Sequence, residues 1–155
     1  MSVVLFLSLI SMTVGLETGI GVPVSGLYGD VSSVQSLNLF FSRSLGVCSV
    51  ELAGGIQNYR AKYDQYSLED YTFLAGLSYR AKPVEFITRL GPSFLRRSLA
   101  DAEEKGWVMS YELGLGLPAR FEKIEIAPVV SYRGLNDLSG SAGMMYLTLR
   151  LGYVL

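Results

Sequence analysis

The side chains of this chain that could do chemistry are mainly carboxylates and guanidinium groups. The 155 residues include no histidine and a single cysteine, Cys48. The lack of histidine excludes a Ser-His-Asp triad and a metal site built on imidazoles, and one cysteine cannot form an intramolecular disulfide. Cys48 falls in an apolar phase of the sequence, where a buried thiol is usually inert. Paired glutamates therefore remain as the candidates for acid–base catalysis.

The spacing of these charges favours a structural role over catalysis. The two signs nearly balance, and charges removed from water are costly unless they are paired and hydrogen-bonded. We therefore expect a salt-bridge network, with Arg89 and Glu112 as one pair because their strands are neighbours in hairpin order. The sequence predicts no enzyme activity and no metal or cofactor site. The predicted network consists of Glu17, Glu51, Arg80, Glu85, Arg89, Glu112, Glu125, Arg133 and Arg150.

Eight segments that carry or adjoin these charges alternate between apolar residues and polar or small ones. This period of two is typical of a β-strand with two different faces. The most regular segment is the last one, in which every second residue from Met145 to Leu155 is large and apolar. Every charge inside the segments falls in the other phase. The predicted strands are residues 16–23, 36–42, 48–53, 71–79, 84–94, 107–117, 124–132 and 145–155.

The connections between these segments alternate between long and short, as in outer-membrane hairpin barrels. The predicted long connections are residues 24–35, 54–70, 95–106 and 133–144, and part of 54–70 is expected to extend the flanking strands. The predicted short turns are 43–46, 80–83 and 118–123. Within the third long loop, Ser98 to Gly106 has helix start and stop signals and predicts a helical turn or a mobile loop. Pro92 and Pro128 each lack a ladder donor, so they predict a bulge or a strand end.

Composition agrees with a membrane barrel. Mean hydropathy is +0.34, and 17% of the residues are charged, compared with about 25% in an average globular chain. A net charge of −1 gives no basic field for nucleic acid. Residues 1–15 form an apolar run that predicts a signal peptide, which leaves residues 16–155 as one barrel domain.

The final strand carries a resemblance to a known family. Leu147, Leu149, Leu151, Tyr153 and Leu155 follow the alternation with which small outer-membrane barrels end. From about residue 16 onward, the chain resembles the small eight-stranded outer-membrane β-barrel family, and is similar to the transmembrane domain of outer membrane protein A and to outer membrane protein X.

The resemblance implies an all-β, eight-stranded antiparallel up-and-down transmembrane β-barrel in the bacterial outer membrane, with both termini in the periplasm. It also implies contact with outer-membrane lipids, and recognition of the C-terminal strand by the barrel-assembly machinery. The two lipid A-modifying enzymes of this barrel size use a histidine, which this chain lacks. Aromatic residues are expected in two membrane-interface belts, one formed by Tyr71, Trp107 and Tyr132 and the other by Tyr79, Phe86 and Tyr153.

Three classes of function are compatible with the pattern. The first is a structural or surface-interaction protein with a filled lumen and displayed loops, in which Arg96 and Arg97 contact lipid phosphates. The second is a small channel or carrier for apolar solutes. The third is a soluble lipocalin-like ligand-binding barrel, which requires a polar outside and an apolar inside. A crowded, charged lumen favours the first class.

Overall fold

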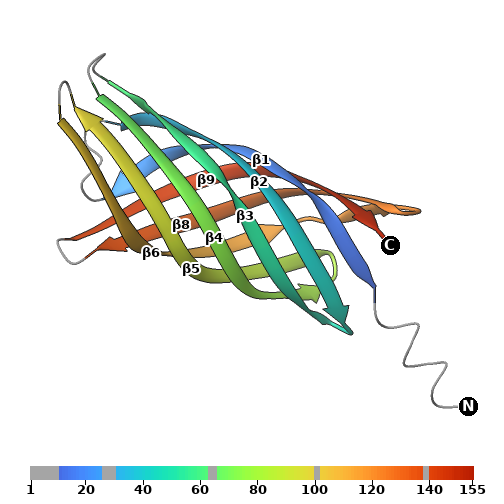
Figure 1. Ribbon diagram of the computed structural model, residues 1–155. Helices are drawn as coiled ribbons and strands as arrows, with labels where there is room; N and C mark the ends of the chain where they lie inside the picture. The colour runs from blue at the N-terminus through green and yellow to red at the C-terminus, as the bar shows by residue number, and fades with distance from the viewer. Residues whose placement is uncertain (1–10, 26–30, 63–65, 100–101, 138–139) are drawn as a thin grey trace, which may run out of the picture.

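The computed structural model describes residues 11–25, 31–62, 66–99, 102–137 and 140–155. Almost all of them lie in antiparallel strands that form one sheet, and β1 pairs with β9 to close it into a barrel (Figure 1). None of these residues belongs to a helix long and apolar enough to cross a membrane. The strands are β1 (Met12–Ser25), β2 (Val31–Leu45), β3 (Cys48–Ala61), β4 (Tyr66–Ala81), β5 (Val84–Leu99), β6 (Ala102–Gly116), β7 (Ala119–Phe121), β8 (Ile124–Asp137) and β9 (Gly140–Val154).

The nine elements make eight strands, because β7 continues β6. Gly116 pairs with Val129 on β8 and Ala119 pairs with Ile126, so the register is unchanged across the break. The break falls at residues 117–118, opposite Pro128, where proline nitrogens cannot donate to the ladder. The predicted fold class, an eight-stranded antiparallel barrel, is confirmed.

The strand pairing fixes the width of the barrel. Following paired residues from Lys105 on β6 through β5, β4, β3, β2, β1, β9 and β8 leads back to β6 at Leu115, ten residues further along. With a rise of about 3.3 Å per residue and about 4.8 Å between strands, this stagger gives a tilt of about 41° and a radius of about 8 Å. Such a lumen is wide enough only for side chains.

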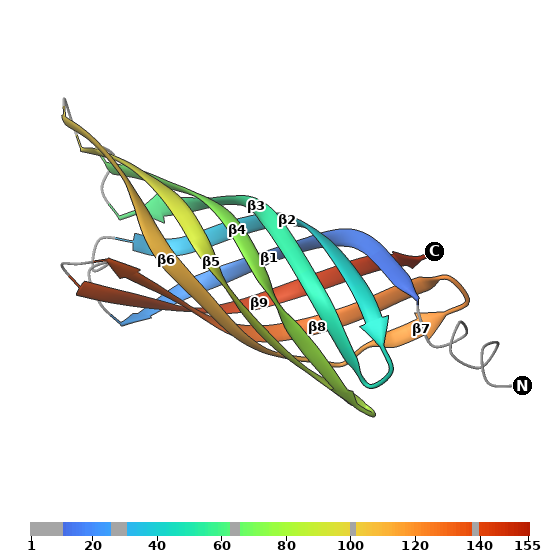
Figure 2. The same cartoon turned by 60° about the horizontal axis from the view of Figure 1, so that its bottom comes forward.

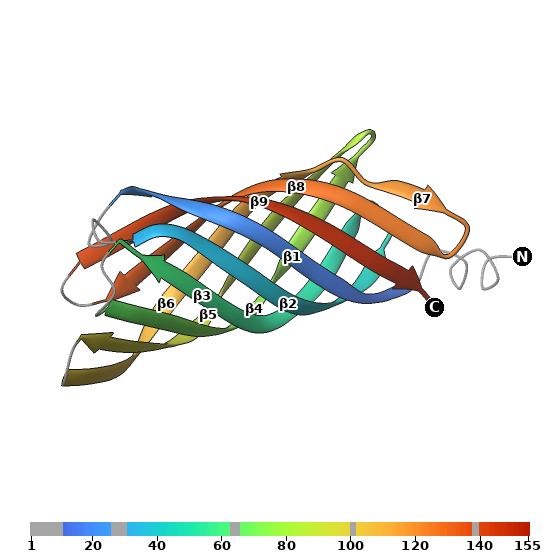
Figure 3. The same cartoon turned by 90° about the horizontal axis from the view of Figure 1, so that it is seen from above.

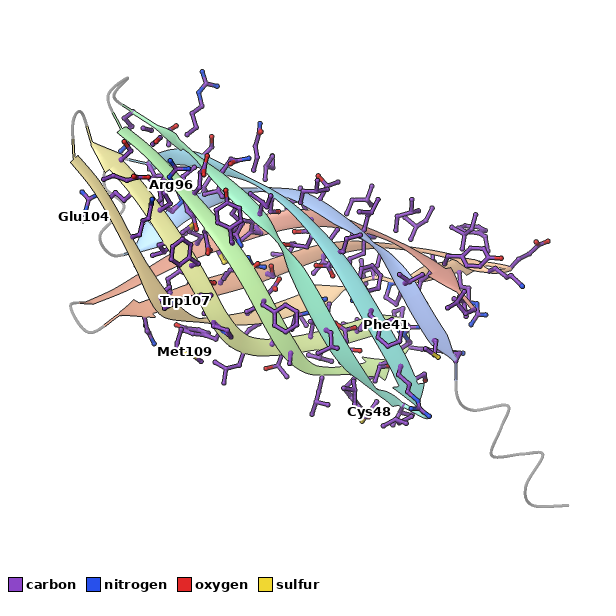
Figure 4. The ribbon with its side chains drawn as sticks, in the orientation of Figure 1. Phe41, Cys48, Arg96, Glu104, Trp107 and Met109 are labelled. Carbon is purple, nitrogen blue, oxygen red and sulfur yellow. The ribbon has the colours of Figure 1, made fainter. Side chains whose placement is uncertain are left out.

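Side chains on the two faces of the wall differ as the alternation predicts. Apolar residues such as Leu113 and Leu149 are exposed on the outside, whereas Glu51 and Arg89 are buried inside. Figure 4 shows Trp107 and Met109 on the outside of β6. This arrangement is the inverse of a soluble lipocalin-like barrel, so that alternative is wrong. Cys48 also lies on the outer, exposed face, so it is not buried in a protein core as its apolar phase suggested.

The predicted long loops are largely strand. The segments 24–35, 54–70, 95–106 and 133–144 are mostly absorbed by β1 to β6, β8 and β9. The helical turn or loop predicted over Ser98 to Gly106 is wrong for the described residues, since Ser98 pairs with Glu103 and Arg96 with Lys105 in the β5–β6 ladder; residues 100 and 101 lie outside the described residues. Cross-strand pairing satisfies backbone groups in both strands, and it overrides the local helix signals.

Two further expectations change. Pro92 causes neither a bulge nor a strand end, since β5 keeps its register with β4 from Leu90 to Ser93; its side chain faces outward, and the register shifts lie elsewhere, near Pro23 and Val31. Strand β1 begins at Met12, where it pairs with β2, and it pairs with β9 from Thr13. It therefore overlaps the end of the predicted signal peptide, which stays a prediction.

The two ends of the barrel differ. Three two-residue turns at 46–47, 82–83 and 122–123 lie at one end, and β1 starts and β9 finishes at that same end (Figure 3). At the other end the β5–β6 hairpin reaches beyond the rest of the wall (Figure 2). The barrel therefore has a short-turn end, which carries the start of β1 and the end of the chain, and a hairpin end with one projecting element.

Candidate functional site

Two features are candidate sites: the charged lumen and the projecting β5–β6 hairpin. The lumen is built by the period-two pattern, which turns every second residue inward. On β4, the inward residue Gly76 lies between Glu51 on β3 and Arg89 on β5. A Cβ at Gly76 would overlap the Thr88 carbonyl oxygen and lie 2.7 Å from the Arg89 Cα. Only glycine lets the strands approach this closely, and the two flanking charged side chains fill the space inside.

Arg89 lies at the centre of the charged network and is almost fully buried, at 2% exposure. It contacts three carboxylates from three other strands. Its Nη1 donates to Glu17 Oε2 at 2.8 Å, and its Nη2 donates to Glu51 Oε2 at 2.7 Å. The expected contact with Glu112 is present but longer, at 3.4 Å. Arg89 therefore joins β1, β3 and β6 across the lumen.

A second buried arginine, Arg150 on β9, shares partners with Arg89. It contacts Glu17 and Glu51, each at 3.0 Å, and Glu85 at 3.3 Å. Its guanidinium carbon lies 4.3 Å from the centre of the Phe40 ring, a cation–π geometry. The pattern gave no sign of the Phe40 contact, because Phe40 is an aromatic residue in the polar phase of its strand.

Arg80 and Arg133 extend the network toward the two ends of the barrel. Arg80, the most exposed of the four arginines, contacts Glu85 at 3.0 Å and Glu125 at 2.9 Å. Arg133 contacts Glu112 at 3.1 Å. These shared carboxylates connect all nine residues of the predicted set in one continuous chain of ion pairs.

Above this network, toward the hairpin end, lies a cluster that the sequence did not indicate. We call it the apolar plug; its buried members are Val31, Val34, Tyr59, Leu68, Leu135, Met144 and Tyr146. The Tyr146 hydroxyl donates to Gln57 Oε1 at 2.5 Å, and Tyr59 donates to Asp70 Oδ2 at 3.5 Å. The plug was missed because several of its members lie in segments predicted as loops; continuing the alternation into them would have placed Gln57 and Tyr59 inside.

The outer face changes from apolar to polar within one row of paired residues at the hairpin end. Leu37, Ile56, Tyr71, Phe94 and Trp107 form one row, and the next row toward the hairpin end is Gln35, Asn58, Glu69, Arg96 and Lys105. The Phe94 and Trp107 rings are 5.2 Å apart. Aromatic residues beneath a polar row are typical of a membrane interface.

Arg96 and Arg97, the predicted lipid-phosphate contacts, lie on opposite faces of the hairpin because they are consecutive in a strand. Arg96 lies on the outer face, donates a hydrogen bond to Glu103, and comes within 4.0 Å of Glu69. That hydrogen bond, with another from Lys105, holds the pKa of the Glu103 carboxyl below its ordinary value. Arg96 is therefore the better placed of the two to contact lipid.

The projecting hairpin leaves one strand edge open. Pairing between β6 and β8 starts at Met109, whereas β6 itself starts at Ala102. Residues 102–108 thus have no partner strand on the β8 side among the described residues, over about 23 Å at about 3.3 Å per residue. Because Leu117 donates its N–H to Pro128 on β8, alternation directs the backbone groups of Glu103, Lys105 and Trp107 to the open side.

These two sites offer binding and structural chemistry. Within the described residues, no cluster of three or more cysteine, aspartate or glutamate side chains is arranged to hold a metal ion. The five glutamates of the ion network, which could act as acid or base, are all held by arginines. An unpaired strand edge, by contrast, can add a strand from another polypeptide.

No family model matches the chain, and no curated protein matches it. Solved structures of small outer-membrane barrels are similar in fold. Neisserial surface protein A has a TM-score of 0.59 at 10% identity, covering 93% of this chain and 96% of its own. Ail, the attachment invasion locus protein of Yersinia pestis, has a TM-score of 0.58 at 16% identity, with coverages of 94% and 97%. The N-terminal β-barrel domain of Pseudomonas aeruginosa OprF has a TM-score of 0.57 at 14% identity, with coverages of 91% and 97%.

Proposed function

We propose that this chain is a bacterial outer-membrane β-barrel with a structural and surface-interaction role, which binds an extended polypeptide along the open edge of β6. The observation that carries the proposal is the unpaired edge at residues 102–108. We propose that the hairpin end faces the outside of the cell. The short-turn end, with both termini, then faces the periplasm. The similar barrels support an outer-membrane location, and the apolar outer face supports contact with its lipids.

The edge is suited to a selective partner. An open edge is a template for aggregation, and charged residues on it restrict which strands can pair. The side chains of Glu103 and Lys105 lie on the outer face of the barrel, and the side chain of Glu104 lies on the opposite face of the strand. Opposite charges across a strand pair stabilise it by about 0.2–1 kcal/mol, and like charges destabilise it. The matching segment therefore carries a basic residue opposite Glu103 and an acidic residue opposite Lys105.

The lumen supports a role that involves no transport. An ion network across the middle of the barrel and the apolar plug above it occupy the interior. A carrier for apolar solutes would need an apolar path, which the four arginines and five glutamates interrupt. We expect the reconstituted barrel to show no steady single-channel current in planar bilayers. A reproducible open conductance would contradict the filled lumen and favour the channel alternative.

The edge proposal can be tested by selecting peptides from a displayed random library on the barrel in lipid nanodiscs. We expect enrichment of extended peptides with alternating charge, and loss of their binding in Lys105→Pro, because proline removes a backbone donor on the open side. Lys105→Ala is the matched control, since it removes the charge and keeps the donor, so binding should weaken only a few-fold. Equal binding to Lys105→Pro and the parent barrel would contradict strand addition.

Location can be tested separately. We expect the protein to fractionate with outer membranes and to show heat-modifiable migration on detergent gels, since a closed barrel resists detergent until heated. The same assay on chains that lack the last strand should show no folded band, because β9 pairs with both β1 and β8. Recovery in the soluble fraction would contradict the membrane assignment.

A further inference from the structure

Three buried polar side chains converge between the ion network and the apolar plug. They are Arg133 on β8, Asp70 on β4 and Gln57 on β3, with exposures of 3%, 0% and 0%. Tyr146 links them, since its ring lies 5.5 Å from the Arg133 guanidinium carbon and its hydroxyl donates to Gln57 Oε1. The opposite charges of Asp70 and Arg133 interact. The three groups thus surround one region of the lumen.

Each of the three has hydrogen-bonding capacity that the described residues do not use. Arg133 uses Nη2 on Glu112, whereas its Nε and Nη1 have no hydrogen-bond partner among the residues described. The same holds for Asp70 Oδ1 and Gln57 Nε2. A buried polar atom without a partner costs about 1–3 kcal/mol, and more when it is charged. Buried groups are therefore almost always satisfied, so each of these atoms requires a partner.

The chemistry of the set identifies that partner. Arg133 and Gln57 supply donors, and Asp70 supplies an acceptor. An anion would accept from Arg133 but would lie against the carboxylate of Asp70, and a cation would lie against the guanidinium. Only a neutral molecule that both donates and accepts satisfies all three. We infer that this region is a hydration site, in which at least one ordered water molecule bridges Arg133, Gln57 and Asp70.

A buried water typically makes about three hydrogen bonds, and the four unpartnered atoms on these three residues can supply them. The inference does not depend on the proposed surface role. Arg133 then has two functions. It ends the ion network through Glu112, and it binds the water that lies next to the apolar plug. The lumen is then hydrated at this level although it is closed to flow.

The test is a crystal structure of the full chain, at a resolution that shows ordered water, from crystals soaked in sodium bromide. We expect a density peak within hydrogen-bond distance of Arg133 and Asp70, without anomalous signal. An anomalous bromide peak at that position would overturn the inference in favour of an anion site. A direct ion pair between Arg133 and Asp70, with no peak between them, would overturn it as well.

Two variants at Asp70 sharpen the test. Asp70→Asn keeps an acceptor oxygen and should keep the peak, whereas Asp70→Leu removes it and should lose the peak. If the leucine variant does not fold, NMR of the parent barrel in nanodiscs decides. The Arg133 Nε–H signal should then show a cross-peak to a slowly exchanging water, and its absence contradicts the hydration site.

Discussion

The outer wall and the lumen of this barrel are made by the same strands and yet follow opposite rules. Outside, single apolar side chains face their surroundings without specific partners, and Leu147 and Leu149 on β9 are about half exposed. Inside, Arg150, the residue that follows Leu149, contacts three glutamates on three strands. The wall therefore tolerates exchange of one apolar residue for another, whereas the lumen depends on particular partners. Substitutions that remove a charge from the lumen, or place one on the outer wall, measure how far the stability of the barrel depends on each.

The largest effect is expected from Arg89→Met. This change leaves Glu17, Glu51 and Glu112 buried with one arginine partner fewer each. Removing one member of a buried ion network typically costs about 3–5 kcal/mol. The measurement is the free energy of unfolding in urea in the presence of lipid vesicles. The matched control is Arg96→Met, which removes an arginine from an exposed pair and should leave the free energy of unfolding nearly unchanged. Equal costs for the two variants would show that the lumen network is dispensable.

Charge on the lipid-facing wall is expected to have the next largest effect. Leu149→Arg and Leu113→Arg place a guanidinium on the outer face, where the cost is about 2–4 kcal/mol near the bilayer midplane. Thr148→Arg puts the same group one residue away on the lumen side, and should be milder. The measurement is the folded fraction in bilayers by heat-modifiable migration. If Leu149→Arg folds as well as the parent barrel, the assignment of inside and outside is wrong.

A smaller effect is expected where the wall and the lumen meet, at Gly76. In Gly76→Ala the new Cβ meets backbone atoms of Thr88 and Arg89, so strands β4 and β5 must move apart. Overpacking of this kind costs about 1–3 kcal/mol. Gly106→Ala is the control, because a Cβ there meets no atom within 4 Å. The measurement is the free energy of unfolding of both variants in urea. If Gly76→Ala leaves that free energy unchanged, the spacing of strands β4 and β5 is adjustable.

The alternation predicts the wall better than it predicts the ends of the strands. In the middle of the barrel the outer face is uniformly apolar, so the phase is evident and all nine network residues fall in one phase of their strands. Toward the hairpin end the outer face becomes polar, at Asn58, Glu69 and Arg96 among others. The pattern loses its contrast there, although the pairing continues, so the segments were predicted as loops and the apolar plug was missed.

Partners across the lumen could not be predicted in full from the sequence. Hairpin order brings Arg89 next to Glu112, but its shorter contacts are with Glu17 and Glu51. These residues meet because the ten-residue stagger tilts the strands and brings distant rows to the same height. The stagger depends on every pairing register in turn, and no single segment of sequence contains it.

The smallest effect is expected on the projecting hairpin, where the outer face leaves the apolar band. We propose that Arg96 contacts lipid phosphate there while it also pairs with Glu103, and that Arg97 contributes less to the lipid contact. Arg96→Ala with Arg97→Ala should leave urea stability nearly unchanged, since exposed ion pairs contribute little, while reducing the dependence of the folding rate on lipopolysaccharide. Because the pKa of Glu103 is lowered in the folded hairpin, its contribution is present above the ordinary glutamate pKa and is lost as pH falls through the lower, folded value. The protection factors of the amides at residues 96–98 and 103–105, which correct for the slower intrinsic exchange in acid, should therefore fall in acid in the parent protein and much less in the double variant. An unchanged lipopolysaccharide dependence in that variant would remove the lipid contact and leave Arg96 as a partner of Glu103 alone.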